Sequence, residues 1–180
     1  MLEPHYRALE KRILEAPFGG LGVIKLIDLW NNQPVDANWT KEKQILPAVF
    51  IEFIPVQWKR STDSVQWGRA VINFHCAQKN IRETNDKAED KTLKRLNRFD
   101  LTNAVAPALN NFSVKDVDGN YIIKSLYLES TVFDNNHDTL ITDTITMSAQ
   151  IFFYDTWREK NWKEIIIQTV EDVEDKTIVI

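Results

Sequence analysis

The alternation of apolar and polar residues predicts one long strand in the carboxyl-terminal third of the chain. From Ile141 to Phe153, six of the seven odd positions are apolar, whereas the even positions from 142 to 150 carry Thr, Ser and Gln. A period of two is typical of a strand with one buried face. Residues 125–134 are its expected partner, across a turn at residues 135–138. Such a long hairpin should either project from its domain or be covered by a neighbouring subunit.

Two stretches show helical spacing instead. In the first, the apolar positions are Leu2, Tyr6, Leu9, Ile13 and Leu14, and the helix should end near Pro17. A second apolar stripe runs from Leu93 to Leu109. There we expect Asp100 to cap a buried helix and Pro107 to kink or break it, because proline lacks the backbone N–H.

Shorter strands are predicted in between. Residues 22–30 are β-branched and apolar, and residues 48–54 form a nearly continuous apolar run, as expected for a strand covered on both faces. Residues 60–64 supply a turn, and period two returns from Arg69 to Cys76. The centre of the chain is therefore expected to be a hairpin.

Composition shifts divide the chain into a single domain at 1–156 and an extension at 157–180. Residues 79–98 carry eleven charges and form an insert or crossover within the domain. The extension is apolar, then acidic, then apolar again, a pattern that cannot easily fold alone and suits docking on another chain. Residues 31–44 are expected to be a long surface loop, which is more often functional or interfacial than idle.

Charge and length exclude several classes of function. The chain has 22 basic and 26 acidic residues and a formal net charge of −4, which argues against a protein that grips nucleic acid with its whole surface. No apolar run approaches the length of a membrane helix, and no apolar signal block stands at the amino terminus. The single cysteine, Cys76, excludes a disulfide framework and is expected to be a small buried residue.

Residues that could carry catalysis are scattered. The three histidines, His5, His75 and His137, have no metal-ligand spacing. Residues 116–120 begin like a calcium loop but lack its later ligands, and a tight turn with Gly119 at positive φ explains them. No phosphate loop or nucleophile elbow is present. We therefore predict no enzyme activity, no catalytic residue, no metal and no cofactor.

Two surface features remain. The basic residues at positions 91, 94, 95 and 98 share one helix face, for which a solvated face is favoured over nucleic-acid contact. The six tryptophans lie near predicted strand ends, in loops or in the tail, where packing at the core edge and subunit contact are equally expected. The candidate subunit or neighbour interface comprises Trp30, Trp39, Trp58, Trp67, Phe133, His137, Trp157, Trp162, Ile166 and Ile178.

The order of these elements resembles that of the tail-terminator and tail-completion (head–tail joining) proteins of tailed bacteriophages and prophages. The likeness lies in a leading helix, the segment 23–33 (VIKLIDLWNNQ), the Pro-Ala-Val strand at 46–53 (LPAVFIEF), a helix around 99–105 and a long hairpin ending at 151–155. It covers roughly residues 9–155 and is a likeness of pattern. The insert at 79–98 and the tail after Trp157 depart from it.

The resemblance implies an α+β fold: a mostly antiparallel sheet with a long β-hairpin and two or three helices packed on one face. It also implies a structural virion protein of the tail or neck, assembled in the host cytoplasm as a homo-oligomeric ring, commonly a hexamer. Its partners would be further copies of itself, the tail tube protein and a head-side connector or adaptor protein, with no specific nucleic acid and no membrane. The family has no catalytic residues.

Three alternatives remain open at this point. The chain could form another neck or connector ring of a virion. It could be a small metal-dependent hydrolase or nuclease that uses scattered acids, namely Asp100, Asp116, Asp118, Asp134 and Asp138. It could also be a monomeric binding module that uses its tryptophan-rich loops.

Overall fold

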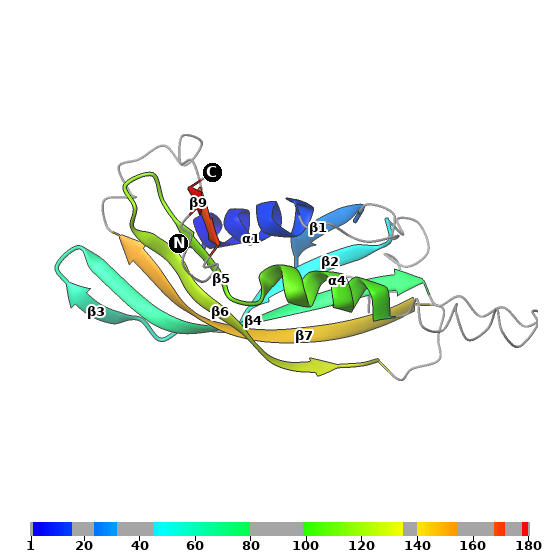
Figure 1. Cartoon of the computed structure of the whole chain (residues 1–180). Coiled ribbons are helices and arrows are strands. Elements are labelled where there is room, and N and C mark those ends of the chain that lie inside the picture. Colours follow the sequence, from blue (N-terminus) through cyan, green and yellow to red (C-terminus); the bar gives the residue numbers. More distant parts are fainter. Residues whose placement is uncertain are drawn as a thin grey trace, which may run out of the picture.

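The computed structural model describes residues 2–15, 24–31, 45–79, 99–134, 140–154, 168–171 and 178–179. In this part of the chain, nine strands form one curved sheet and two helices lie against one of its faces (Figure 1). Of the predicted insert at 79–98, Lys79 ends β4 and residues 80–98 lie outside the described residues, as does most of the carboxyl-terminal extension.

Strand pairing makes the sheet mostly antiparallel. The helices are α1 (Glu3–Glu15) and α4 (Asp100–Leu109). The strands are β1 (Leu26–Leu29), β2 (Ala48–Phe53), β3 (Lys59–Thr62), β4 (Val65–Lys79), β5 (Phe112–Lys115), β6 (Tyr121–Val132), β7 (Leu140–Tyr154), β8 (Gln168–Glu171) and β9 (Ile178–Val179). Their order is β1-β2-β4-β7-β6-β5-β8-β9, with β3 paired to β4. Only β1 and β2 run parallel among these strands, so the predicted α+β class is confirmed.

The longest contact in the fold joins β4 to β7. The two 15-residue strands pair in unbroken register, from Val65 opposite Tyr154 to Lys79 opposite Leu140. The side chains at odd positions from 141 to 153 are buried, as the alternation predicted. β6 pairs with the other edge of β7, so the predicted partner of the long strand is also confirmed. The connecting residues 135–139 lie outside the described residues.

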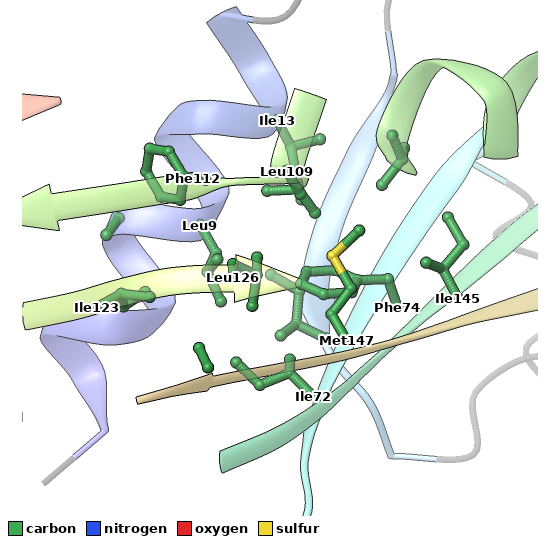
Figure 2. Close-up of a cluster of buried hydrophobic side chains, with 14 of the residues drawn as sticks. Leu9, Ile13, Ile72, Phe74, Leu109, Phe112, Ile123, Leu126, Ile145 and Met147 are labelled. Atoms are coloured by element: carbon green, nitrogen blue, oxygen red, sulfur yellow. The ribbon is translucent and has the colours of Figure 1, made fainter. Parts of the chain in front are cut away.

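The apolar face of β7 is covered by the chain's own helices, so this face needs no neighbouring subunit; whether the hairpin projects or is covered elsewhere stays a prediction. Leu9 and Ile13 of α1 and Leu109 of α4 pack over Phe74 and Met147 in one buried cluster (Figure 2). Each of these five side chains is essentially inaccessible to solvent. Burying a large apolar side chain stabilises a fold by about 1.5–3 kcal/mol, so this cluster joins helices and sheet into one unit.

Helix boundaries differ in detail from the predictions. Leu14 is exposed, because it is turned about 100° from the buried Ile13 on the helix. Asp100 is the first residue of α4 and not its cap; Phe99 occupies the cap position without a side-chain cap bond. Pro107 lies in the last turn and does not break α4, because only one backbone bond is lost there.

The centre of the chain also needs one correction. Residues 60–62 belong to β3, where Lys59 lies opposite Trp67 and Thr62 opposite Val65, so the turn is confined to residues 63–64. β2 pairs with β4 as predicted, and its first four residues are buried on both faces. The predicted hairpin therefore contains an extra short strand at its tip.

The turn between β5 and β6 is the one predicted from residues 116–120. Gly119 has φ of 80°, and the buried Asp116 accepts the backbone N–H groups of Asp118 at 3.0 Å and of Asn120 at 2.9 Å through Oδ1. A carboxylate that accepts two backbone N–H groups of its own turn stabilises that turn, so Asp116 has a structural role here.

Two further expectations concern buried and membrane-spanning residues. Cys76 is fully buried in the main core, as predicted, and burial raises the pKa of its thiol far above the ordinary value. Neither helix in the described part of the chain has the length and apolar character needed to cross a bilayer.

β6 changes register twice against β7, and its pairing with β5 covers only part of its length. The first irregularity falls between Lys124 and Tyr127, where Ser125 has φ of 55° and donates its N–H to the hydroxyl of Ser113 at 2.9 Å. The second falls between Leu128 and Ser130. β5 pairs with β6 only as far as Leu126. Beyond that residue, β7 is the one strand that pairs with β6 within the described residues.

His5 joins the start of α1 to the end of the long strand. Its Nε2 atom donates to the carbonyl oxygen of Phe152 at 2.9 Å, and the imidazole is fully buried. Burial is the main reason that the pKa of His5 falls from 6.5 to about 4, because a buried site disfavours the charged ring.

We predict that this histidine destabilises the fold as the pH falls from about 6.5 to about 4. In that window the unfolded chain binds a proton at His5 and the folded chain does not, so the free energy of unfolding decreases, by at most about 3 kcal/mol. Denaturant unfolding at a series of pH values measures the effect. His5→Gln is the matched control, because its amide can still donate to Phe152 and does not titrate. Identical pH slopes for both proteins would contradict the prediction.

Candidate functional site

The second face of the sheet carries no helix from the described residues. On this outer face, β2, β4 and β7 present side chains that alternate with the buried ones. Many are polar, and they form cross-strand contacts; the residues are Glu52, Asn73, His75, Thr142, Thr144, Thr146, Ser148 and Gln150. One face of an antiparallel sheet can carry polar side chains of this kind without a covering layer.

One hydrogen-bonded network crosses the centre of this outer face. Asn73 donates to Oε2 of Glu52 at 2.8 Å, and the hydroxyl of Thr146 donates to Oδ1 of Asn73 at 3.0 Å. The imidazole of His75 lies between Oε2 of Glu52 at 3.0 Å and the hydroxyl of Thr144 at 3.1 Å. The hydrogen bond from Asn73, followed by the contact with His75, lowers the pKa of Glu52 below its ordinary value.

Trp30 covers one end of the network. Its ring stacks on His75, with centroids 3.8 Å apart and planes 19° apart, and meets Phe50 edge to face at 6.1 Å. Ala48, Phe50 and Ala77 form a small buried cluster beneath it, against which Trp30 is packed. The outer face therefore has its own small apolar patch beside β1.

The groove on the outer face lies further along β6 and β7. It has a volume of about 560 Å³, and its lining includes Trp67, Arg69, Tyr127 and Glu129. Arg69 donates to Glu129 at 2.8 Å and to the hydroxyl of Ser148 at 3.2 Å, and Ser148 donates to Glu129. The hydrogen bond from Ser148, and then that from Arg69, lower the pKa of Glu129, so this exposed carboxylate stays ionised at neutral pH.

Exposed apolar side chains gather where β6 leaves β5. Tyr127 is 52% exposed, Leu128 45%, Val132 62% and Phe133 42%. Phe133 meets Phe99 edge to face at 5.1 Å, which places it beside the start of α4. Four large apolar residues on seven positions of one strand edge and its end form a surface of the kind that proteins usually cover. We call residues 127–133 the β6 edge.

Thr144, His75 and Glu52 form a hydroxyl–imidazole–carboxylate chain, an arrangement that can activate a nucleophile. The three side chains lie on neighbouring central strands, and none of them lines the groove. The geometry therefore favours a structural role over a catalytic one: Thr144, His75 and Glu52 form a ladder of hydrogen bonds that orients the ring of His75 beneath Trp30.

The aspartates proposed for a metal-dependent enzyme are not brought together. Asp100 begins α4, whereas Asp116 and Asp118 belong to the β5–β6 turn. Asp134 accepts the N–H of Thr142 at 3.2 Å, and Asp138 lies outside the described residues. Among the described residues, no three His, Cys, Asp or Glu side chains are grouped as a metal ion requires.

The structure places four of the predicted interface side chains. Trp58 is half-buried and packs on the main core, with Phe153 edge to face at 6.3 Å, so it serves as core packing. Trp30 packs on the outer face, Trp67 lines the groove with the ammonium of Lys59 5.3 Å from its ring, and Phe133 belongs to the β6 edge. The four are therefore spread over several parts of the molecule.

The other predicted interface residues have no described side chain. The backbone of Ile178 lies in β9, which pairs with β8. Five residues lie outside the described part of the chain, namely Trp39, His137, Trp157, Trp162 and Ile166. For all of these, subunit contact stays a prediction.

Tyr127, Leu128 and Val132 were not singled out by the sequence analysis. The signal that could have found them is the run Leu126-Tyr127-Leu128, which interrupts the alternation expected of a half-buried strand. A break of this kind indicates a bulge, which changes the face to which later residues point.

The chain matches no protein-family model and no curated protein sequence.

We predict that the network on the outer face contributes to stability through Glu52. Glu52→Ala leaves the Asn73 amide and the His75 ring without their shared acceptor, which should lower the free energy of unfolding by about 1–2 kcal/mol. Glu52→Gln is the matched control, because its amide oxygen can still accept one of these bonds, and it should cost less. Chemical denaturation measures both variants, and an equal loss in the two would count against the proposed role of the acceptor.

Proposed function

We propose that this protein is a structural virion protein that forms a homo-oligomeric ring, caps a phage tail tube and joins it to the head-side connector. The observation that carries the proposal is the β6 edge. Apolar side chains are exposed there, on a part of β6 that does not pair with β5, although the core side chains of the same chain are shielded from solvent. A surface of this kind favours association with further protein.

The arrangement of elements supports the same assignment. The resemblance to tail-terminator proteins implies helices on one face of a mostly antiparallel sheet, and the described part of the chain has this architecture. The scattered aspartates and the position of the Thr144–His75–Glu52 ladder away from the groove give less support to a hydrolase. We therefore propose that the protein is not an enzyme.

The proposal includes a long hairpin made of β6 and β7. Residues 135–139 connect these two strands in the sequence, and His137 among them is one of the predicted contacts. The remaining predicted contacts, Trp39, Trp157, Trp162 and Ile166, would then meet neighbouring copies, the tail tube protein or the connector. Another ring of the virion neck would use the same kind of surface and is the alternative assignment.

Loss of the gene tests the function. In the phage or prophage that encodes this chain, a stop codon early in the gene should give filled heads without attached tails and tail tubes of irregular length. A ring that ends the tube is needed both to stop polymerisation and to present a surface to the head. Electron microscopy of lysates measures both defects, and supply of the intact gene in trans should reverse them.

The two ring assignments predict different particles. A neck ring on the head side would leave unattached tails of normal length, which supports the alternative. Complete virions with tails of normal length would overturn both assignments.

A further inference from the structure

We propose that the groove on the outer face of the sheet binds an acidic peptide segment of a partner protein. Arg69 and Lys124 line the groove from two different strands, and they would receive the carboxylates of that segment. The proposed contact goes beyond the proposed function, because it concerns the chemistry of one partner and does not require the chain to form a ring.

The groove lies over β4, β7 and β6, which run side by side through the middle of the sheet (Figure 1). Every residue that lines it lies at least four positions inside a described range. Its volume of about 560 Å³ is within the range of pockets that bind ligands. The side chain of Arg69 is 72% exposed, so the groove is open to solvent. Because a small ligand is normally enclosed over most of its surface, this open shape favours a segment of a larger molecule.

Pairing between the strands places two cations on one row of the groove. Arg69 lies opposite Gln150, and Gln150 lies opposite Lys124 on its other side. Side chains of paired residues share a face, and neighbouring strands are about 4.8 Å apart, so the Cα atoms of Arg69 and Lys124 are separated by about 10 Å. Alternate side chains of an extended peptide are about 7 Å apart, so two flexible acidic side chains can reach both cations.

Arg69 has donors that a ligand can use. Its hydrogen bonds to Glu129 and to Ser148 both come from Nη2. Within the described residues, Nε and Nη1 make no hydrogen bond, and they belong to an exposed side chain. A hydrogen bond from a guanidinium to a carboxylate is charge-assisted and therefore stronger than one between neutral groups.

Lys124 belongs to a small cluster of cations. Its ammonium lies 5.4 Å from the centre of the Tyr121 ring, and the ammonium of Lys115 lies 4.5 Å from the same centre. Neither ammonium forms an ion pair within the described part of the chain. Because like charges repel each other, an anion that binds beside Lys124 is favoured.

Apolar side chains border the same groove. Trp67 lines it from β4, and Tyr127 and Leu128 line it from β6. Tyr127 and Leu128 are both about half exposed. We therefore expect apolar residues between the acidic residues of the peptide, because protein interfaces combine a buried apolar centre with charged groups near the rim.

A strand of nucleic acid fits the groove less well. Glu129, which is ionised at neutral pH, is among the lining residues and would repel a continuous row of phosphates. Binding of single strands also uses free aromatic faces for base stacking, whereas the ring of Trp67 has the ammonium of Lys59 5.3 Å from its centre. The formal net charge of −4 adds to the repulsion of a polyanion.

Fluorescence anisotropy tests the contact with the full-length protein. The probe is a short fluorescein-labelled peptide in which glutamate and valine alternate, and it should bind saturably with a Kd of about 100 µM or below. The same peptide with glutamine in place of glutamate should bind about tenfold more weakly or worse. Equal binding of the two peptides, or no saturable binding of the acidic one, would overturn the proposal.

Substitutions locate the binding in the groove. Lys124→Gln and Arg69→Gln should each weaken binding of the acidic peptide by about fivefold or more, because each removes one cation from the row. Lys11→Gln is the matched control, since it removes the same charge from α1 on the other face of the sheet, and its Kd should equal that of the wild type. Circular dichroism establishes that each variant is folded. Unchanged affinity in both groove variants, or an equal loss in the control, would overturn this site.

A labelled thymidine oligonucleotide separates the two classes of ligand in the same assay. It should bind more weakly than the acidic peptide. Binding of the oligonucleotide that is as tight as that of the peptide and is lost in Lys124→Gln would overturn the assignment of the groove to a peptide. These measurements need no virion, so their outcome is separate from that of the gene-loss experiment.

Discussion

The pairing of β4 with β7 is the constraint on which the rest of the molecule depends. Fifteen residues of each strand pair without a register shift, so every side chain on these two strands has a fixed face. A slip of one strand by one residue would turn its own core side chains outward, so that His75 would replace Phe74 in the core if β4 slipped, or Thr144 would replace Ile145 if β7 slipped. The buried cluster under α1 and α4 and the polar network on the outer face are therefore two results of one register.

The strands beside this central pair behave differently. β2 continues the regular pairing of β4 and β7. Its first four residues are buried on both faces, between the main core and the small cluster under Trp30. β6 is less regular, because its register against β7 shifts at two places and its pairing with β5 ends at Leu126. Four of the eight large apolar side chains that are exposed in the described residues lie within residues 127–133. That concentration is the reason the candidate interface is so narrow.

Much of the fold could be predicted from alternation alone. The faces of β7, the pairing of β6 with it, the turn at Gly119 and the burial of Cys76 all depend on residues that are near in sequence or on a strict period of two. The errors have local causes as well. Leu14 was counted with a face to which it does not belong, and Pro107 lies close enough to the helix end to be tolerated.

The candidate site was harder to predict because it depends on where pairing stops. The sequence of β5 does not indicate that its pairing with β6 ends at Leu126. The backbone of Ser125 also has a positive φ, a conformation that serine rarely adopts and that the sequence does not predict. The positions of the tryptophans in the sequence were also a poor guide to the interface. Trp30 and Trp58 each lie next to the end of a strand, yet Trp58 packs on the main core and Trp30 on the opposite face.

The buried position of Cys76 has a consequence for the reactivity of its thiol. Its sulfur lies at the bottom of the main core, and the reactive thiolate is suppressed by that environment. Oxidants, glutathione and the thiols of neighbouring molecules therefore do not reach this thiol in the folded chain. The side chain of Cys76 is therefore expected to stay a thiol in reducing and in oxidising surroundings alike, as long as the chain is folded.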